Sequence, residues 1–407
     1  MKSHFRFDVI RDANSRKLVA GQLISQVCDK VMSLGLIWII SDQFAAKWIP
    51  WFIAVSTLPH LLLAPYSGRI VARIGPLRTV ILTDFFRGAL FLLAAAALPI
   101  VSGAESLPFS GVLALLFFVS FVSSMAGSLF NPAILTLPVK LAPAGSLQEL
   151  TAMVDSCFSL GNVLGPLFSV LVYQWVGLPG LLVVNGLSYI YSGILEMGIR
   201  PPRPESSTQQ KAEPPARIFR ILKKESVIRG MLMSFLLMNL VLAPVMVFLP
   251  WYAKNVFGGQ ISTLATLEFF MGLGSVLGSL WLSFGRVPGG LGIRILASLV
   301  LMAASYLGFT LAPQLMFGCI AIGFLGLFLA LANIFILNFF QTRPEEKDVP
   351  VVMGLVNLIS VASLPVSMGL IGFFIESIQV EVFAVVCALI LMALAAGTRA
   401  IPGIREI

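Results

Sequence analysis

The sequence predicts an all-α, polytopic membrane protein with twelve transmembrane helices in two pseudo-symmetric six-helix bundles. Three observations support this prediction: the composition, a series of long apolar runs, and one polar segment near the middle of the chain. Hydrophobic residues make up 58% of the 407 residues and charged residues 11%, whereas soluble domains average about 45–50% and about 25%. This composition excludes an ordinary globular enzyme, and its high apolar content excludes a disordered chain.

Twelve continuous apolar runs cover most of the chain, and each has about the 20 residues that an α-helix needs to cross a bilayer. The runs are too long and too continuous for the strands of a membrane β-barrel, which alternate over about 10 residues. The first run is also longer than the apolar core of a cleavable signal peptide, so we expect it to remain as a membrane helix. The predicted spans are residues 18–40, 48–66, 79–100, 109–130, 152–176, 180–199, 230–251, 261–284, 294–312, 314–340, 351–375 and 380–399.

Residues 200–229 interrupt this series and divide the spans into six and six. The stretch from Arg200 to Pro215 is polar and proline-rich, which is typical of a linker. The stretch from Ala216 to Arg229 alternates basic and apolar residues, as an amphipathic helix at a membrane surface does. We therefore predict an N-terminal bundle over residues 1–199, a cytoplasmic linker with an amphipathic helix over residues 200–229, and a C-terminal bundle over residues 230–407.

The two halves of the chain resemble each other. Gly68 and Gly75 lie seven residues apart after span 2, before a basic turn. Gly278 and Gly285, at the end of span 8, have the same spacing and are offset from the first pair by 210 residues. Together with the central linker, this pattern indicates two parallel six-helix repeats.

The basic residues predict the orientation. If both termini and all even-numbered loops share one side, that side holds 23 of the 27 Lys and Arg residues, and the opposite side holds only Lys47 and Lys254. Loops rich in Lys and Arg stay in the cytoplasm, so we expect both termini to be cytoplasmic and the protein to lie in the inner (plasma) membrane. The net charge of +8 then reflects contact with anionic lipid rather than with nucleic acid.

The loop between spans 2 and 3 combines glycines with basic residues. Its pattern, Gly-x-x-x-Ala-Arg-x-Gly-x-x-Arg over residues 68–78, resembles the signature loop of the major facilitator superfamily. The family's loop usually carries an aspartate where this chain has Ala72, and in the family that aspartate helps to latch the two halves together on the cytoplasmic side. The resemblance implies a gating role for Gly68, Arg69, Arg73, Gly75 and Arg78.

A second motif lies in span 5, where Gly161-Asn-Val-Leu-Gly165-Pro166 resembles the motif of the family's exporters. Small residues one helical turn apart allow a neighbouring helix to approach closely, and Pro166 lets the helix bend because it removes a backbone hydrogen bond. Plain tight packing would produce the same pattern.

Two further segments narrow the resemblance. Asp84-Phe-Phe-Arg87 in span 3 and Phe130-Asn-Pro-Ala133 at the end of span 4 resemble the drug:proton antiporter subgroup of bacterial macrolide exporters, and they are similar to lysophospholipid transporters as well. The resemblance covers essentially the whole chain. It implies the major facilitator fold and secondary transport by alternating access between the two bundles.

Span 1 carries a polar stripe. Gln22, Gln26 and Asp29 lie at positions i, i+4 and i+7, which share one helical face. Lipid cannot solvate such a face, so it should point into the bundle. Asp29 is our first candidate for a proton-coupling carboxylate, and Gln22 and Gln26 are candidates for lining the substrate cavity. Lys30 leaves an alternative, in which it pairs with Asp29 and the two residues are structural.

Ionisable residues near the cytoplasmic side are candidates for gating. Asp84 and Arg87 in span 3 lie at i and i+3 and can pair on one helical face. We expect an intrahelical or gate ion pair there rather than contact with substrate. Asp155 lies at the start of span 5, and we expect it to pair with the basic loop between spans 2 and 3.

Span 8 carries an isolated acid, Glu268, about seven residues from its start and therefore roughly 10 Å deep. Phe269 follows it, and an acid beside aromatic rings suits a lipophilic or cationic ligand. Glu268 is our second proton-coupling candidate, and the alternative is a hydrated residue near the outer interface. Four asparagines are candidates for lining the cavity or for bridging helices: Asn162, Asn239, Asn333 and Asn357.

These features favour a secondary transporter that exports a small amphipathic or lipophilic compound in exchange for protons. The alternative is a translocator that moves lysophospholipid between leaflets. The sequence has no GxxxxGK[ST] loop for ATP, and its loops lack the clusters of acids or histidines that an enzyme or a metal site needs. We therefore expect no catalytic residues, no metal and no cofactor other than the coupling proton. We also expect a monomer whose partners are membrane lipid and a small-molecule or lipid substrate.

Overall fold

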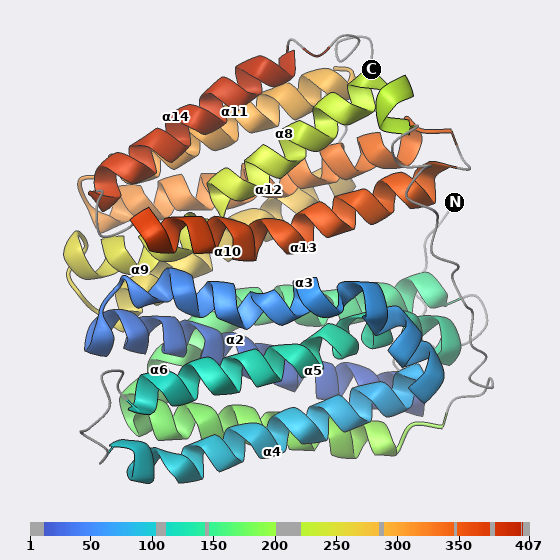
Figure 1. Cartoon of the computed structure of the whole chain (residues 1–407), viewed down its shortest axis with the longest axis vertical. Coiled ribbons are helices and arrows are strands. Elements are labelled where there is room, and N and C mark those ends of the chain that lie inside the picture. Colours follow the sequence, from blue (N-terminus) through green and yellow to red (C-terminus); the bar gives the residue numbers. More distant parts are fainter. Residues whose placement is uncertain are drawn as a thin grey trace. The chain divides into compact units, whose positions relative to one another are not determined.

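The computed structural model describes residues 12–102, 111–142, 146–200, 221–284, 289–345, 348–374, 379–399 and 401. Regular structure is helical throughout these residues (Figure 1). In chain order the elements are α2 (Ala13–Ile39), the π-helical turn η1 (Ile40–Phe44), α3 (Trp48–Ile74), α4 (Pro76–Ser102), α5 (Gly111–Leu141), α6 (Leu147–Met197), α8 (Ser226–Leu242), α9 (Val245–Asn255), α10 (Ile261–Phe284), α11 (Leu291–Thr310), α12 (Leu315–Thr342), α13 (Val349–Phe374) and α14 (Val380–Arg399).

These helices account for the twelve predicted spans. Within the described residues, eleven helical segments are long and apolar enough to cross a membrane. One of them, α6, holds both span 5 and span 6, which join at Gly177, where φ is 59° and ψ is −158°. Glycine enters this region of backbone space without steric strain, and Pro179 follows in the first turn of the second half of the helix. Because α6 supplies two crossings, the all-helical twelve-span prediction is confirmed.

Some helix boundaries differ from the predicted ones. α3 continues to Ile74, eight residues beyond the predicted end of span 2, and α4 begins at Pro76. Only Gly75 separates the two helices, and its φ of 95° requires a residue without a Cβ atom. The segment expected to be a loop is therefore mostly helix, with its basic residues on the last turns of α3 and the first turn of α4.

The region of the predicted linker is described only in part, because residues 201–220 lie outside the described residues. Of the predicted amphipathic helix over residues 216–229, residues 221–224 form one helical turn, and α8 begins at Ser226 rather than at residue 230. Span 7 is itself divided into α8 and α9 at Pro244, which cannot donate the backbone hydrogen bond of a continuous helix.

The chain divides into two compact units, and the predicted bounds of the two bundles and the linker stay a prediction. The first unit comprises Met1–Phe44 and Val55–Gln210, and the second comprises Ala45–Ala54 and Lys211–Ile407. The first turns of α3 thus group with the second unit, and the remainder of α3 belongs to the first.

Glycines allow close helix packing in the first unit. A Cβ atom at Gly161 would lie 3.0 Å from the carbonyl oxygen of Gln26, and one at Gly165 would collide with the Cβ atom of Lys30. The residue numbers rise together along the two segments, so α2 and the first half of α6 run parallel, as spans 1 and 5 should. The close approach expected at these two glycines is present.

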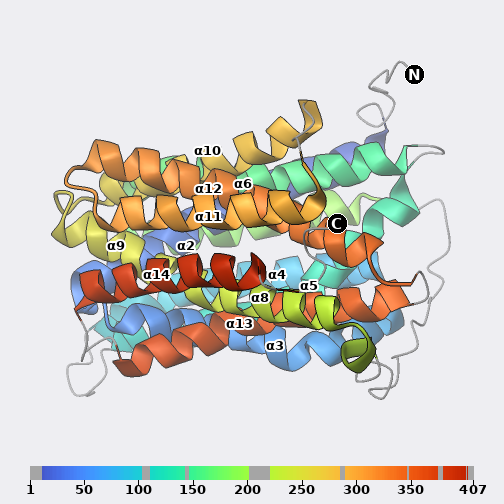
Figure 2. The ribbon, with the colours of Figure 1, turned by 90° about the horizontal axis from the view of Figure 1, so that it is seen from above.

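In the second unit, glycines also allow close packing, here between spans 8 and 10. α12 lies between α10 and α11 (Figure 2). A Cβ atom at Gly278 would lie 2.6 Å from the carbonyl oxygen of Leu327, and one at Gly274 would collide with the carbonyl oxygen of Gly323. α10 and α12 therefore pack backbone against backbone along parallel axes.

Candidate functional site

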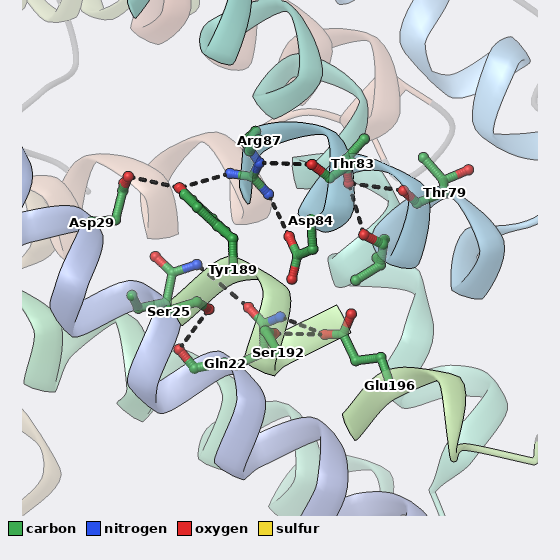
Figure 3. A network of polar contacts seen from close by, with 12 residues as sticks. Gln22, Ser25, Asp29, Thr79, Thr83, Asp84, Arg87, Tyr189, Ser192 and Glu196 are labelled. Atoms are coloured by element: carbon green, nitrogen blue, oxygen red, sulfur yellow. Dashed lines mark hydrogen bonds and ion pairs between the residues drawn. The ribbon is translucent and has the colours of Figure 1, made fainter. Parts of the chain in front are cut away.

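Three helices of the first unit, α2, α4 and α6, enclose a polar network (Figure 3). α2 and α6 carry an amide, two of the carboxyl groups and a tyrosine, and α4 carries the single guanidinium group together with a third carboxyl group. The polar network comprises Gln22, Ser25, Asp29, Thr79, Thr83, Asp84, Arg87, Tyr189, Ser192 and Glu196.

Arg87 lies at the centre of the polar network. Its Nη2 donates to Asp84 Oδ1 at 2.9 Å, its Nη1 to Tyr189 Oη at 3.1 Å, and its Nε to the Thr83 carbonyl oxygen at 3.4 Å. The guanidinium carbon also lies 4.4 Å from the ring centroid of Phe130 and 4.3 Å from that of Tyr189. The ion pair expected between Asp84 and Arg87 is present, and both side chains are buried. Because it is paired with an acid and lies against two aromatic rings, the cation keeps its charge without bulk water.

Tyr189 connects this ion pair to α2. Its hydroxyl accepts from Arg87 and donates to Asp29 Oδ1 at 2.7 Å, which uses its one hydrogen and one of its lone pairs. The ring of Tyr189 stacks on Phe91 with centroids 6.0 Å apart. Asp29 is half-buried, whereas Asp84 and Glu196 are buried, so among the carboxyl groups of the polar network Asp29 has the most exposed surface.

Glu196 forms the other end of the polar network. Its Oε1 accepts from Gln22 Nε2 at 2.8 Å and from Ser192 Oγ at 3.3 Å. Gln26 Nε2 in turn donates to Gln22 Oε1 at 3.4 Å, which fixes the orientation of the Gln22 amide. Glu196 has no exposed surface, and its Oε2 has no hydrogen-bond partner among the described residues.

The two contacts between α2 and α6 share one register. Gln22 meets Glu196, and Asp29, seven residues later, meets Tyr189, seven residues earlier. α2 and the second half of α6 are therefore antiparallel, as spans 1 and 6 should be, and the contacts are about 10 Å apart along the helices. Beyond Glu196, Lys17 Nζ donates to the Gly198 carbonyl oxygen at 2.6 Å and closes this end of the helix pair.

The structure brings together five residues that the sequence singled out. Gln22, Gln26, Asp29, Asp84 and Arg87 lie in or directly against the polar network. Lys30, the alternative partner of Asp29, is exposed on another face of α2, and Asp29 bonds to Tyr189 instead.

The residues of the loop motif lie apart from the network. Gly68, Arg69, Arg73 and Arg78 are exposed, whereas Gly75 is buried. The Gly75 carbonyl oxygen accepts from Thr79 Oγ1 at 2.8 Å. The turn is therefore hydrogen-bonded to the first of the α4 residues that belong to the polar network. A cluster of apolar side chains packs around the turn and includes Val71, Leu77, Val80, Phe130, Ile134 and Leu141.

Asp155 and the span 5 residues have mixed environments. Asp155 is exposed on α6, and its pairing with the basic residues of the loop motif stays a prediction. Pro166 is buried within α6, and its carbonyl oxygen accepts from Ser169 Oγ at 2.7 Å. Asn162, expected in the cavity or between helices, is exposed.

The remaining candidates belong to the second unit. Glu268 is half-buried on α10, and the neighbouring rings of Phe269 and Phe270 meet edge to face with centroids 5.8 Å apart. Asn239 donates to the Phe235 carbonyl oxygen within α8 at 2.8 Å. Asn333 on α12 is half-buried and Asn357 on α13 is exposed.

Sequence reasoning missed six members of the polar network: Ser25, Thr79, Thr83, Tyr189, Ser192 and Glu196. The last three recur every three or four residues along the second half of α6, which places them on one helical face. That spacing was visible in the sequence, as was an acid inside the predicted span 180–199. Among the described residues, no group of three or more His, Cys, Asp or Glu side chains has an arrangement that would hold a metal ion.

Comparison with known proteins places these features in context. The model of the Major Facilitator Superfamily matches residues 18–368. Macrolide efflux protein A of Streptococcus pyogenes is 22% identical over 372 residues, which is 89% of each chain. The putative bacilysin exporter BacE of Bacillus subtilis is 23% identical over 271 residues, so the match spans only 65% of that protein's length.

Solved structures share the fold at low sequence identity. A bacterial homologue of the iron transporter ferroportin, in an inward-facing state, gives a TM-score of 0.70 at 14% identity and covers 94% of this chain and 98% of its own. A bacterial homologue of the human lysosomal transporter Spinster gives a TM-score of 0.65 at 14% identity and covers 100% and 99%.

Proposed function

The chain belongs to the major facilitator superfamily and is a membrane transporter with efflux-type relatives, and we propose that it couples export of a small amphipathic or lipophilic compound to proton entry. Family members and structural neighbours are transporters rather than enzymes. The named substrates of two relatives, a macrolide and bacilysin, make an organic compound the first class to test.

The polar network is the observation that supports proton coupling. It holds three carboxyl groups, Asp29, Asp84 and Glu196, and one guanidinium group, that of Arg87. One carboxylate balances Arg87, which leaves two acids in excess inside a bundle. An ionised side chain at the centre of a membrane helix costs about 2.5–3.5 kcal/mol unless it is paired or hydrated, so the network favours binding protons as it loses contact with water.

Within this proposal Asp29 is the carboxyl group that exchanges protons with solvent in the first unit. It is half-buried and holds its hydrogen bond to Tyr189, so its charge acts on Arg87 through one hydroxyl group. Glu268 is the corresponding candidate in the second unit, where the rings of Phe269 and Phe270 provide apolar surface for an amphipathic ligand.

The surroundings of the protein complete the proposal. We place it in the plasma membrane with both termini in the cytoplasm, because of the excess of Lys and Arg in the even-numbered loops. We further propose that it acts as a monomer. Membrane lipid and the transported compound are its partners, and the proton is the only coupling species.

Transport in proteoliposomes tests this function. Purified full-length protein is reconstituted, radiolabelled erythromycin serves as the first probe, and a pH gradient of either sign is imposed. We expect erythromycin to move against the proton flux and Asp29→Asn to reduce gradient-driven movement. Movement that is unchanged when an ionophore dissipates the gradient would refute proton coupling.

The same vesicles test the lipid translocator. Fluorescent lysophospholipid in one leaflet is followed by leaflet-specific quenching. Movement of this lipid at wild-type rates in the absence of a pH gradient, with no movement of erythromycin, would replace the export proposal with the translocator.

A further inference from the structure

Glu196 is the most isolated acid in the polar network. Its two hydrogen-bond donors, Gln22 and Ser192, are both neutral and both reach Oε1, while Oε2 has no partner among the described residues. Its side chain is completely buried, although it lies only one residue before the last residue of α6.

Among the residues that the structure describes, no cation forms an ion pair with Glu196. The three guanidinium nitrogens of Arg87 donate to other partners, one of them the acid Asp84. Lys17, the basic side chain on the facing turn of α2, donates to the Gly198 carbonyl oxygen. Two charged groups of α4 act on Glu196. One is the acid Asp84, and the other is Arg87, which is already paired with Asp84. Burying an unpaired carboxylate costs more than leaving one carboxylic O–H without an acceptor, so the protonated form is favoured.

The second unit shows that this helix contact does not need an acid. Span 12 ends at Arg399, and its Thr398 donates to Ser234 Oγ of α8 at 3.1 Å. Spans 7 and 12 are the repeats of spans 1 and 6, so the Ser234–Thr398 contact corresponds to the contact between Gln22 and Glu196. Two neutral hydroxyl groups close the helix pair there, and a carboxyl group in the first unit therefore calls for a reason other than packing.

We propose that Glu196 is a second proton-binding site of the first unit, additional to Asp29, and that Gln22 and Ser192 hold its protonated form. The inference rests on the proposed proton-coupled function. A hydronium ion at the cytoplasmic end of α6 transfers its proton to Oε2, an O–H bond forms, and water is left. On release the same bond breaks and the proton returns to water. The charge that remains between α2 and α6 then requires water, so release is tied to the opening of this end of the helix pair.

Infrared difference spectroscopy tests the site without a known substrate. Full-length protein in lipid nanodiscs is titrated from neutral to alkaline pH, and the C=O stretching band of protonated carboxyl groups is recorded. We expect a wild-type band that Glu196→Gln diminishes and that Glu196→Asp shifts in frequency. The matched control Thr398→Val alters the corresponding contact of the second unit and should leave the band unchanged.

Two spectral outcomes would overturn the assignment. One is a band that is the same in Glu196→Gln as in the wild type. The other is a band lost completely in Asp29→Asn, which would place the proton on Asp29 alone. If Glu196→Gln fails to fold, the frequency shift in Glu196→Asp decides in its place, and an unshifted band counts against the proposal.

Transport separates this inference from the proposed function. With erythromycin as probe, we expect Glu196→Gln to lose gradient-driven transport by about tenfold or more while retaining counterflow, which needs no net proton movement. A wild-type protein that ignores the pH gradient would refute the proposed function. A coupled wild type with an equally coupled Glu196→Gln variant would refute the role of Glu196.

Discussion

The two units differ in the side chains that fill the space between corresponding spans. In the first unit, spans 1, 3 and 6 meet at the charged polar network. In the second, spans 7, 9 and 12 meet at aromatic rings: Phe248 of α9 lies 6.5 Å from Tyr306 of α11 and 5.8 Å from Phe383 of α14, between ring centroids. Phe248 and Tyr306 are completely buried.

The difference shows that the spans at corresponding positions of a bundle can pack together through aromatic rings instead of a charged network. Replacing a buried ion pair by apolar side chains is often neutral or stabilising in other proteins, and the second unit is the apolar version of the first. The charges around Arg87 are therefore best explained by transport rather than by folding.

The largest effect is expected when Arg87 is replaced alone. Arg87→Leu leaves Asp84, which has no exposed surface, without its counter-ion. Removal of one partner of a buried pair destabilises by about 3–5 kcal/mol. The free energy of unfolding, measured by denaturant titration of the purified protein in detergent, should fall by this amount.

The double variant Asp84→Leu/Arg87→Leu gives the first unit an apolar centre like that of the second. We expect it to recover most of the lost stability and to abolish gradient-driven transport. A double variant that is as unstable as the single one would break the comparison, because the charges would then be needed for packing.

The helix contact at Gly278 in the second unit should be more sensitive to a new Cβ atom than the contact at Gly161 in the first. Gly278→Ala places a Cβ atom 2.6 Å from the backbone oxygen of Leu327, whereas Gly161→Ala places one 3.0 Å from that of Gln26. We expect losses of about 1–3 kcal/mol and less than about 1 kcal/mol respectively, from overpacking. Gly354→Ala, with nothing within 4 Å of the new atom, is the control and should gain up to about 1 kcal/mol in helix propensity. Equal losses at Gly278 and Gly354 would contradict the packing argument.

The twelve spans were predictable because lipid imposes a length and a polarity on each crossing. The ends of the helices were not. α3 runs on to Ile74 because the helix continues beyond the apolar core, where exposed side chains such as Arg69 and Arg73 are hydrated without disturbing the backbone. Hydropathy marks where a helix leaves lipid, whereas backbone conformation, here at Gly75, marks where it ends.

The site was predictable where charged or amide side chains interrupt an apolar run, as Gln22 and Gln26 do. Asp29, Asp84 and Arg87 stand out for that reason. Tyr189 does not, because a tyrosine is unremarkable in a membrane helix until its hydroxyl group is seen between two charged groups. Glu196 lies so near the end of its span that hydration would be expected, and only the packing of α2 and α4 against α6 buries it. Contacts between distant segments are not contained in the periodicity of any one helix.

Two tyrosines allow hydrogen bonds to charged groups to be compared with a hydrogen bond to a neutral group. Tyr189→Phe keeps the ring that stacks on Arg87 but removes the link between Arg87 and Asp29. Tyr252→Phe in the second unit removes a neutral bond to the Thr310 carbonyl oxygen, at 3.1 Å. Hydrogen bonds to charged groups contribute about 1.5–3 kcal/mol and neutral ones about 1 kcal/mol, so Tyr189→Phe should be the more destabilising in the same denaturant assay. Only Tyr189→Phe should also change the pH dependence of transport, and a matching change in Tyr252→Phe would argue against a special role for the network.

The smallest effect is expected at the exposed ion pair between Lys224 and Glu345, which has the same N–O distance as the buried pair between Arg87 and Asp84. Lys224 Nζ lies 2.9 Å from Glu345 Oε1 in the second unit, the distance that separates Arg87 from Asp84, but the two side chains are 66% and 52% exposed rather than buried. The Glu345 carboxylate raises the pKa of Lys224 through their hydrogen bond. The contribution of the pair is therefore present at neutral pH and is lost only as the pH rises through the alkaline range in which Lys224 deprotonates. Water and salt screen such a pair, so Lys224→Ala should leave the thermal unfolding midpoint at neutral pH unchanged within error. A decrease comparable to that of Arg87→Leu would mean that distance, rather than burial, governs how much an ion pair matters in this protein.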